Sequence, residues 1–373
     1  MNKAVRAVEL SEAGLEVVWD TGERASYPWF WLRDHATDAE SYDPRSGQRE
    51  LYTAGLDPGI RGLAARLGSG GHSVEIDWPD GPQGVAYDAE FLWRFRAPAP
   101  AATAPDRRRP WDRATIAAAP VELPYPEAVA DEAGLQRLLR SLETWGLAVL
   151  TGTPAKLDSV ADLAGKIGYV RETIFGGLWE FEANEARADS AYTPQTLRPH
   201  TDGTYSHDAP GLQILLCLDY QAEGGDSLLV DGLEIGRRLA AERPADYATL
   251  GRIPIPGQYL GDGAQLLAER PAFRHDRDGR ILQVSFNNYD RAPFRLPEPD
   301  MTALYRAITA FDRLANDPAL QWRRGLRPGD LLILDNWRVL HARDAFIGKR
   351  RMAGCYLNRE DFESRLRLLH QDD

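Results

Sequence analysis

The feature that most constrains the fold is a run rich in proline, alanine and arginine, RAPAPAATAPDRRRP, between Arg96 and Pro110. Proline lacks a backbone N–H and fixes φ, so such a run holds neither a helix nor a central strand. We therefore predict a small β-rich N-terminal domain over residues 1–96, a connector over 97–120 and a larger domain over 121–373. A length of 373 residues, which exceeds the usual size of one core, agrees with this division.

Local patterns differ on the two sides of the connector. Alternating strands such as LEVVWD, from Leu15 to Asp20, precede it. Beyond it, the segment from Asp131 to Gly146 has apolar residues at helical spacing and ends in glycine, which predicts a helix. The remainder, from about Tyr192, predicts short strands separated by turns, with further helices near 233–241 and 301–314.

Charge and cysteine content exclude several classes of partner. The net charge of −12 argues against binding to nucleic acid, which needs a clustered basic face. Cys217 and Cys355 lie in apolar runs, and we expect two buried free thiols in a reducing compartment. No apolar stretch is long enough to span a bilayer, and the start MNKAVRAVEL lacks the apolar region of a signal peptide. We therefore expect a cytoplasmic protein.

The segment LRPHTDGTYS places His200 two residues before Asp202. A ferrous centre for oxygen chemistry needs two imidazoles and one carboxylate, which leave three positions open. Residues two apart on a strand point to the same side, so the pair supplies two ligands. Taken alone, the tripeptide is explained equally well as a solvated turn.

A second histidine and an arginine follow far downstream. His341 closes an apolar run that starts at Leu331, and Arg350 lies nine residues further on. Each also has an ordinary explanation, as a strand-end histidine bonded to backbone and as a surface cation. The planar fork of arginine, however, matches a carboxylate with two hydrogen bonds, so Arg350 beside a His/Asp/His set suits 2-oxoglutarate.

With these residues assembled, the chain resembles a known family along nearly its whole length. It is similar to the Fe(II)- and 2-oxoglutarate-dependent hydroxylases of carnitine biosynthesis, trimethyllysine dioxygenase and gamma-butyrobetaine dioxygenase, within the taurine-dioxygenase-like group, and closest to the trimethyllysine type. This resemblance implies a mainly β fold with flanking helices, whose catalytic core is a double-stranded β-helix (jelly roll). The matching segments are WFWLRDH, IGYVRETIFGGLW, DSAYT, HTDGTYS, GGDSLLVDG, FNNYDRAPF, DNWRVLHARDAF and RRMAGCYLNRED.

The resemblance also implies the roles of the central residues. His200, Asp202 and His341 would bind Fe(II), Arg350 would bind the far carboxylate of 2-oxoglutarate, and Arg343 would support it. O2 and 2-oxoglutarate would then be converted to succinate and CO2 as a C–H bond is hydroxylated, with ascorbate as a candidate reductant.

Aromatic residues are implied to recognise the substrate. Phe175, Trp179, Tyr192 and Tyr356 stand where the family builds a cage for a trimethylammonium group. Such a cation donates no hydrogen bond, so ring faces are its natural partners. Phe175 and Trp179 are four residues apart, and one core-facing stripe would explain that pair as well.

The other end of the substrate distinguishes the members of the family. Asp189 stands where trimethyllysine enzymes have an acid for the α-ammonium group, and Gly203 replaces a tyrosine expected of butyrobetaine enzymes. Both favour 3-hydroxylation of N6-trimethyllysine. The candidate contacts for the substrate carboxylate are Asn287, Asn288 and Arg291. A structural ion pair would explain Arg291 equally well.

Other readings are open alongside this one. They are a gamma-butyrobetaine hydroxylase, a hydroxylase of another quaternary amine such as trimethylaminoethylphosphonate, and a non-catalytic quaternary-amine binding protein. Many relatives have an N-terminal zinc site of three cysteines and a histidine. Here Ala36, Asp38 and Ser41 occupy the cysteine region and His35 alone remains, so no zinc is expected. The family habit implies a homodimer.

Overall fold

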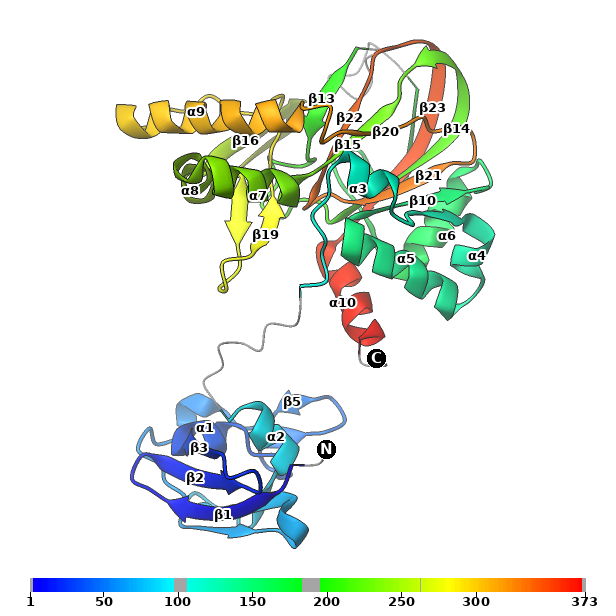
Figure 1. The fold of residues 1–373 in the computed structure, drawn as a ribbon. Coiled ribbons are helices and arrows are strands. Elements are labelled where there is room, and N and C mark those ends of the chain that lie inside the picture. The colour runs from blue at the N-terminus through cyan, green and yellow to red at the C-terminus, as the bar shows by residue number, and fades with distance from the viewer. Residues whose placement is uncertain (1–2, 97–105, 183–194, 262, 371–373) are drawn as a thin grey trace. The chain divides into compact units, whose positions relative to one another are not determined.

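The computed structural model describes residues 3–96, 106–182, 195–261 and 263–370. The chain divides into two compact units, Met1–Pro105 and Asp106–Asp373 (Figure 1). Each unit has its own core and is described by itself.

The second unit begins earlier than we expected, because residues 106–120 pack within it. The backbone N–H of Arg109 donates to Thr144 O at 2.8 Å. Trp111 is 1% exposed, and its Nε1 donates to Trp145 O at 2.7 Å. A short helix, α3 (Arg113–Ala117), follows. The expected connector over 97–120 is thus shorter, since its last part contributes a tryptophan to the second core.

Two three-stranded antiparallel sheets form the N-terminal unit, as expected for a small β-rich domain. Its core is rich in tryptophan, with Trp19, Trp29 and Trp78 buried together. The elements are β1 (Val5–Leu10), β2 (Gly14–Trp19), β3 (Arg24–Pro28), α1 (Trp29–Asp34), β4 (Tyr42–Asp43), β5 (Gln48–Arg49), η1 (Thr53–Gly55), β6 (Ala64–Leu67), η2 (Ser69–Gly71), β7 (Ser73–Asp77), β8 (Val85–Asp88) and α2 (Ala89–Arg94).

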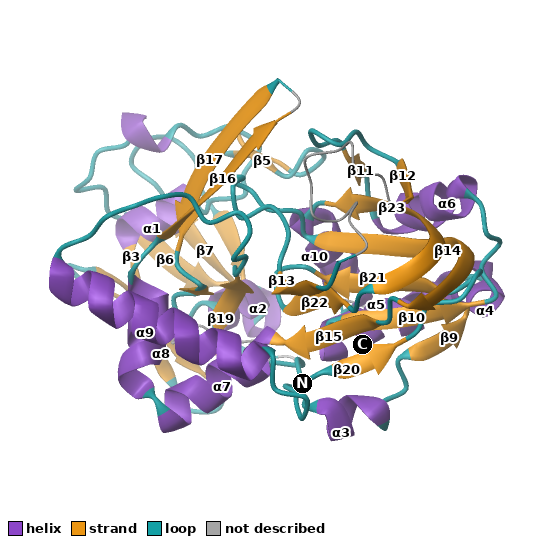
Figure 2. Cartoon of the chain, turned by 90° about the horizontal axis from the view of Figure 1, so that it is seen from above, coloured by secondary structure: helices purple, strands orange, loops and turns teal. Residues whose placement is uncertain are grey.

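Two facing sheets form the centre of the second unit (Figure 2). The larger sheet has the order β11-β23-β14-β21-β10-β9, with β12 also paired to β23, and the smaller has the order β13-β22-β15-β20. The strands of the larger sheet are β9 (Glu122–Pro124), β10 (Leu147–Thr151), β11 (Val170–Arg171), β12 (Trp179–Glu182), β14 (Leu212–Gly224), β21 (Leu331–Asp335) and β23 (Phe346–Leu357). Those of the smaller sheet are β13 (Leu197–His200), β15 (Ser227–Asp231), β20 (Trp322–Arg324) and β22 (Val339–Arg343).

Alternation along β14 explains why the larger sheet is covered on both faces. Leu212, Ile214 and Leu216 belong to the core shared with the outer helices, whereas Cys217 belongs to the core shared with Leu229 of the smaller sheet. This two-sheet arrangement confirms the predicted jelly-roll core. The outer helices are α4 (Tyr125–Ala130), α5 (Glu132–Trp145), α6 (Leu157–Ile167) and α10 (Arg359–Leu369).

The predicted helix over 131–146 is α5. Asp131 caps its first turn by accepting a hydrogen bond from Gly134 N, and Gly146 ends it with φ of 76°. Helices near 233–241 and 301–314 are present too, and both cysteines are buried free thiols. No helix in the described ranges is both long and apolar enough to cross a membrane. The remaining elements are α7 (Gly232–Glu242), α8 (Pro244–Arg252), β16 (Ile255–Gly261), β17 (Ala264–Arg270), β18 (Phe273–His275), β19 (Ile281–Val284) and α9 (Glu298–Ala315).

Candidate active site

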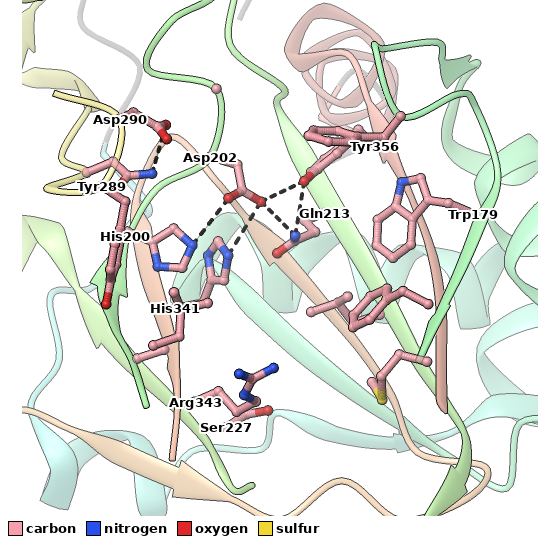
Figure 3. A pocket seen from close by; sticks show the side chains of 18 of the residues that line it. Trp179, His200, Asp202, Gln213, Ser227, Tyr289, Asp290, His341, Arg343 and Tyr356 are labelled. Atoms are coloured by element: carbon pink, nitrogen blue, oxygen red, sulfur yellow. Dashed lines mark hydrogen bonds and ion pairs between the residues drawn. The ribbon is translucent and has the colours of Figure 1, made fainter. Parts of the chain in front are cut away.

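The two histidines of the predicted iron site lie opposite each other on neighbouring strands. His200 ends β13, and its partner in the ladder with β22 is His341, so their ring centroids are 4.3 Å apart. Asp202 lies between them, with Oδ1 3.3 Å from His200 Nε2 and Oδ2 3.4 Å from His341 Nε2 (Figure 3). One donor atom from each residue falls within 4.8 Å of the others, a spacing that could hold a metal ion.

We expected Asp202 on the same strand as His200, but it lies in the bend that follows β13. Asn336 holds this bend, because its Oδ1 accepts from Asp202 N at 2.8 Å and its Nδ2 donates to Asp202 O at 3.1 Å. Gly203 continues the bend with φ of +72°, and a Cβ there would lie 2.6 Å from Pro210 Cδ. Glycine at this position is therefore a requirement of the backbone.

Electrostatics keep Asp202 ionised. Burial by itself would raise its pKa, but the charges of His341 and His200 and their hydrogen bonds hold the pKa well below its usual range. Burial would lower the pKa of His200, yet the hydrogen bond and charge of Asp202 outweigh burial and raise it. The pKa of His341 is lowered, mainly by burial. The cluster thus combines one carboxylate with two imidazoles.

The donor set fits a ferrous ion. The Nδ1 atom of His200 lies 2.8 Å from Arg198 O; a hydrogen bond donated from Nδ1 would leave Nε2 unprotonated and directed at Asp202. Two imidazoles and one carboxylate on one face are the ligands of the Fe(II) oxygenases that bind O2 and a chelating cosubstrate.

Two arginines line the same cavity. Arg350 on β23 is 7% exposed, and its Nε has no hydrogen-bond partner among the described residues. Arg343, at the end of β22, donates from an Nη to Gln195 O at 2.8 Å. Burial lowers the pKa of both, and with the nearby charge of Arg350 it lowers that of Arg343 to about 10. A buried pair of guanidinium groups is a binding place for a dicarboxylate.

The cavity has a volume of about 370 Å³ and has aromatic walls. The rings of Trp179 and Tyr356 lie 5.8 Å apart, and Phe175 meets Tyr259 at 5.8 Å. Three of the four predicted cage residues therefore line one cavity with the His/Asp/His cluster. The fourth, Tyr192, lies outside the described residues.

The residues predicted to bind the other end of the substrate lie in different places. Asn287 lines the cavity, where its Nδ2 donates to Asp290 Oδ2 at 2.8 Å. Asn288 is exposed and Arg291 stacks on Tyr305 at 5.9 Å, and neither is among the residues that line this cavity. Asp189 lies outside the described residues.

Three polar residues near the cluster were missed by the sequence reasoning. They are Gln213, Asp290 and Asn336, of which the first two line the cavity. Gln213 had a visible signal, since it is the one uncharged polar residue in the apolar run from Leu212 to Leu218. Asp290 lies in the matching segment FNNYDRAPF and Asn336 in DNWRVLHARDAF, but their roles depend on contacts between distant segments.

The segment around His35 and Ser41, where we expect no zinc, is held by hydrogen bonds and an ion pair. An Nη of Arg33 donates to Ser41 Oγ at 2.8 Å, and its Nε pairs with Asp80 at 2.8 Å. The Nδ1 of His35 lies 2.8 Å from Trp31 O and its Nε2 3.1 Å from an Nη of Arg49. The absence of zinc stays a prediction.

Comparison with known proteins agrees with this geometry. Residues 107–356 match the model of the taurine catabolism dioxygenase TauD, TfdA family. The chain belongs to this family. Residues 7–93 match the N-terminal domain of gamma-butyrobetaine hydroxylase-like proteins. With these matches and the His/Asp/His cluster, the predicted Fe(II)- and 2-oxoglutarate-dependent dioxygenase is confirmed as the class of enzyme.

Individual relatives are similar over most of their length. Trimethyllysine dioxygenase of Meyerozyma guilliermondii is 30% identical over 95% of this chain and 93% of its own. Mitochondrial trimethyllysine dioxygenase of Homo sapiens is 30% identical over 92% of this chain and 82% of its own. Gamma-butyrobetaine dioxygenase of a Pseudomonas species (strain AK-1) is 29% identical over 96% of this chain and 94% of its own.

Proposed function

We propose that this protein hydroxylates N6-trimethyllysine at C3, with conversion of 2-oxoglutarate and O2 to succinate and CO2. The observation that carries the proposal is the convergence of three features on one cavity. These are the His/Asp/His cluster, the buried arginine pair and the paired rings of Trp179 and Tyr356.

The proposed roles follow from the donor atoms. His200, Asp202 and His341 hold Fe(II), which when bound supplies the oxidising chemistry. Arg350 binds the distal carboxylate of 2-oxoglutarate, because its buried Nε has no other described partner. Arg343 adds charge beside it while donating to backbone at Gln195 O.

The rest of the cavity positions the substrate. Trp179 and Tyr356 present ring faces to the trimethylammonium group, whose attraction to a π-face does not require a hydrogen-bond donor. Holding that group in place brings one carbon of the substrate to the iron and keeps others away. We assign the α-ammonium group to Asp189, and Asp290 is the described acid of the cavity, apart from Asp202, that competes for this role.

Gamma-butyrobetaine hydroxylation is the second candidate function, favoured by the Pseudomonas relative of nearly equal identity. The two substrates share the trimethylammonium group, but gamma-butyrobetaine has no α-ammonium group. An acid facing that end would repel its carboxylate, which favours trimethyllysine.

The experiment is a screen of succinate formation over trimethylated amines, with mass detection of a product heavier by one oxygen atom. We expect fast turnover with N6-trimethyllysine, slow turnover with gamma-butyrobetaine and none with unmethylated lysine. His341→Ala is the matched control and should be inactive with all three. A faster reaction with gamma-butyrobetaine would favour the second candidate.

Two finer features are part of the proposal. We expect a homodimer, as the resemblance implies, and a reducing, cytoplasmic setting that matches the two buried free thiols. Sedimentation velocity of the purified protein would measure the first, and fractionation of the source cells the second.

A further inference from the structure

The two oxygens of the Asp202 carboxylate have different surroundings. Oδ2 accepts two hydrogen bonds, from Gln213 Nε2 at 2.7 Å and from the Tyr356 hydroxyl at 2.8 Å, and it also lies 3.4 Å from His341 Nε2 (Figure 3). Oδ1 contacts His200 Nε2 at 3.3 Å and accepts no hydrogen bond from any other described residue. Each oxygen therefore faces one imidazole, and among the described residues Oδ2 alone also accepts hydrogen bonds from other side chains.

Each carboxylate oxygen has two lone pairs for hydrogen bonds or metal ions. On Oδ2, Gln213 and Tyr356 occupy lone pairs in addition to the contact with His341, whereas Oδ1 has His200 as its described neighbour and keeps more lone-pair capacity for a cation between the imidazoles. We propose that Gln213 and Tyr356 are positioning residues, which reserve Oδ2 and make Asp202 an iron ligand through Oδ1 alone. The inference rests on the proposed function and deepens it, because it assigns the binding oxygen and the side chains that select it.

This selection decides how many positions on the iron are open. Two imidazoles and one carboxylate oxygen would occupy three of six positions on Fe(II), which would leave three for the two chelating oxygens of 2-oxoglutarate and for O2. If both oxygens of Asp202 were bound, the protein would occupy four positions. The site would then bind 2-oxoglutarate and leave no position for O2.

The two donors are built into neighbouring strands. Gln213 on β14 is the ladder partner of Tyr356 on β23, and both are buried, at 5% and 9% exposed. An amide in an apolar strand costs free energy unless it is bonded, and Gln213 Oε1 is buried without a described partner. Its Nε2 donates to Asp202 Oδ2 at 2.7 Å and more weakly to the Tyr356 hydroxyl at 3.5 Å, so the shorter bond to Asp202 is the main polar interaction of this side chain.

Tyr356 also contacts an aromatic residue of the proposed cage. Its ring lies 5.8 Å from that of Trp179 in the proposed cage, while its hydroxyl donates to the iron ligand. One side chain therefore touches both the place proposed for the trimethylammonium group and the carboxylate that binds iron.

The test uses nitric oxide as a probe of the O2 position, without any trimethylated substrate. Wild type, Tyr356→Phe, Gln213→Leu and the double variant are loaded anaerobically with Fe(II) and 2-oxoglutarate, and the iron–nitrosyl signal is measured by electron paramagnetic resonance per bound iron. We expect a full signal from wild type and a loss of about tenfold or more in the double variant, the size expected when hydrogen bonds to a charged group are removed. Bound 2-oxoglutarate should persist throughout.

Controls separate this role from a merely structural one. Tyr289→Phe removes a hydroxyl of the same cavity that accepts from Arg198 N at 3.0 Å, and its nitrosyl signal should equal that of wild type. Melting temperatures show whether each variant folds; a structural role alone would lower them without changing the signal per bound iron. Should the double variant not fold, the single variants decide, with an intermediate loss expected in each.

Failure of this inference and failure of the proposed function would give different results. Full nitrosyl signals in variants that still bind iron and 2-oxoglutarate would overturn the role of Gln213 and Tyr356. The absence of iron or 2-oxoglutarate binding in wild type would instead overturn the proposed function itself.

Discussion

Arg343 and Arg350 line the same cavity: an Nη of Arg343 donates to the backbone oxygen of Gln195, and no hydrogen-bond partner of the Arg350 Nε lies among the described residues. Two buried cations in one cavity repel each other, and the charge of Arg350 adds to burial in lowering the pKa of Arg343. A bound dicarboxylate would relieve that repulsion.

The first prediction concerns this pair. Arg350→Ala should raise the apparent Kd for 2-oxoglutarate by an amount equivalent to about 2–5 kcal/mol, because one carboxylate would stay buried without its fork of donors. Arg343→Ala should have the smaller effect. Titration of 2-oxoglutarate into the Fe(II) protein without O2 measures both, and a reversed order would show that the dicarboxylate is placed wrongly.

The second prediction concerns the metal ligands. His341→Ala should lose tight Fe(II) binding and turnover, since only two protein ligands would remain. The fold should persist, because His341 is one residue of a ladder that is otherwise unchanged. Competition with a metal chelator measures the affinity, and circular dichroism checks the fold. Full activity in this variant would be incompatible with the proposed iron site.

The third prediction concerns the aromatic cage. Trp179→Ala should raise the KM for trimethyllysine and for gamma-butyrobetaine alike, because both carry the group that the rings bind, and we expect a loss of about 1–2 kcal/mol for each. Trp179→Phe should keep part of the affinity. Initial rates over a range of both substrates give the two values. A loss confined to one substrate would remove Trp179 from the trimethylammonium site.

The fourth prediction concerns the acid for the α-ammonium group. Asp189→Asn should narrow the preference for trimethyllysine over gamma-butyrobetaine, since an amide of similar size no longer repels an anionic end. Asp290→Asn is the matched comparison, because Asp290 also lines the cavity and accepts from Asn287. Ratios of kcat/KM for the two amines measure the effect. A change of preference in the second variant alone would transfer the role to Asp290.

Local patterns predicted the parts of the fold that local physics determines. The helix over 131–146 followed from apolar spacing and Gly146, and its ends are set by Asp131 and that glycine. The extent of the connector did not follow, because Trp111 is buried in a core with residues distant in sequence and donates to Trp145 O at the end of α5. Composition describes the flexibility of a segment but not what it packs against.

The candidate site shows the same limit. The His200–Asp202 pair and His341, together with the family resemblance, predicted the ligands. Asp202, however, lies in a bend held by Asn336 from the turn between β21 and β22. The role of Gln213 depends on the register between β14 and β23, which places it beside Tyr356. Such pairings are properties of the folded sheet and cannot be read from either segment alone.

The most direct test of the central claim is a reaction of the wild-type protein with Fe(II), 2-oxoglutarate and N6-trimethyllysine under O2 labelled with oxygen-18. We expect each turnover to place one labelled atom in the hydroxylated amine and one in succinate, with the two products formed in equal amounts. Hydroxylated amine without label, or succinate formed at the same rate in the presence and absence of trimethyllysine, would contradict it.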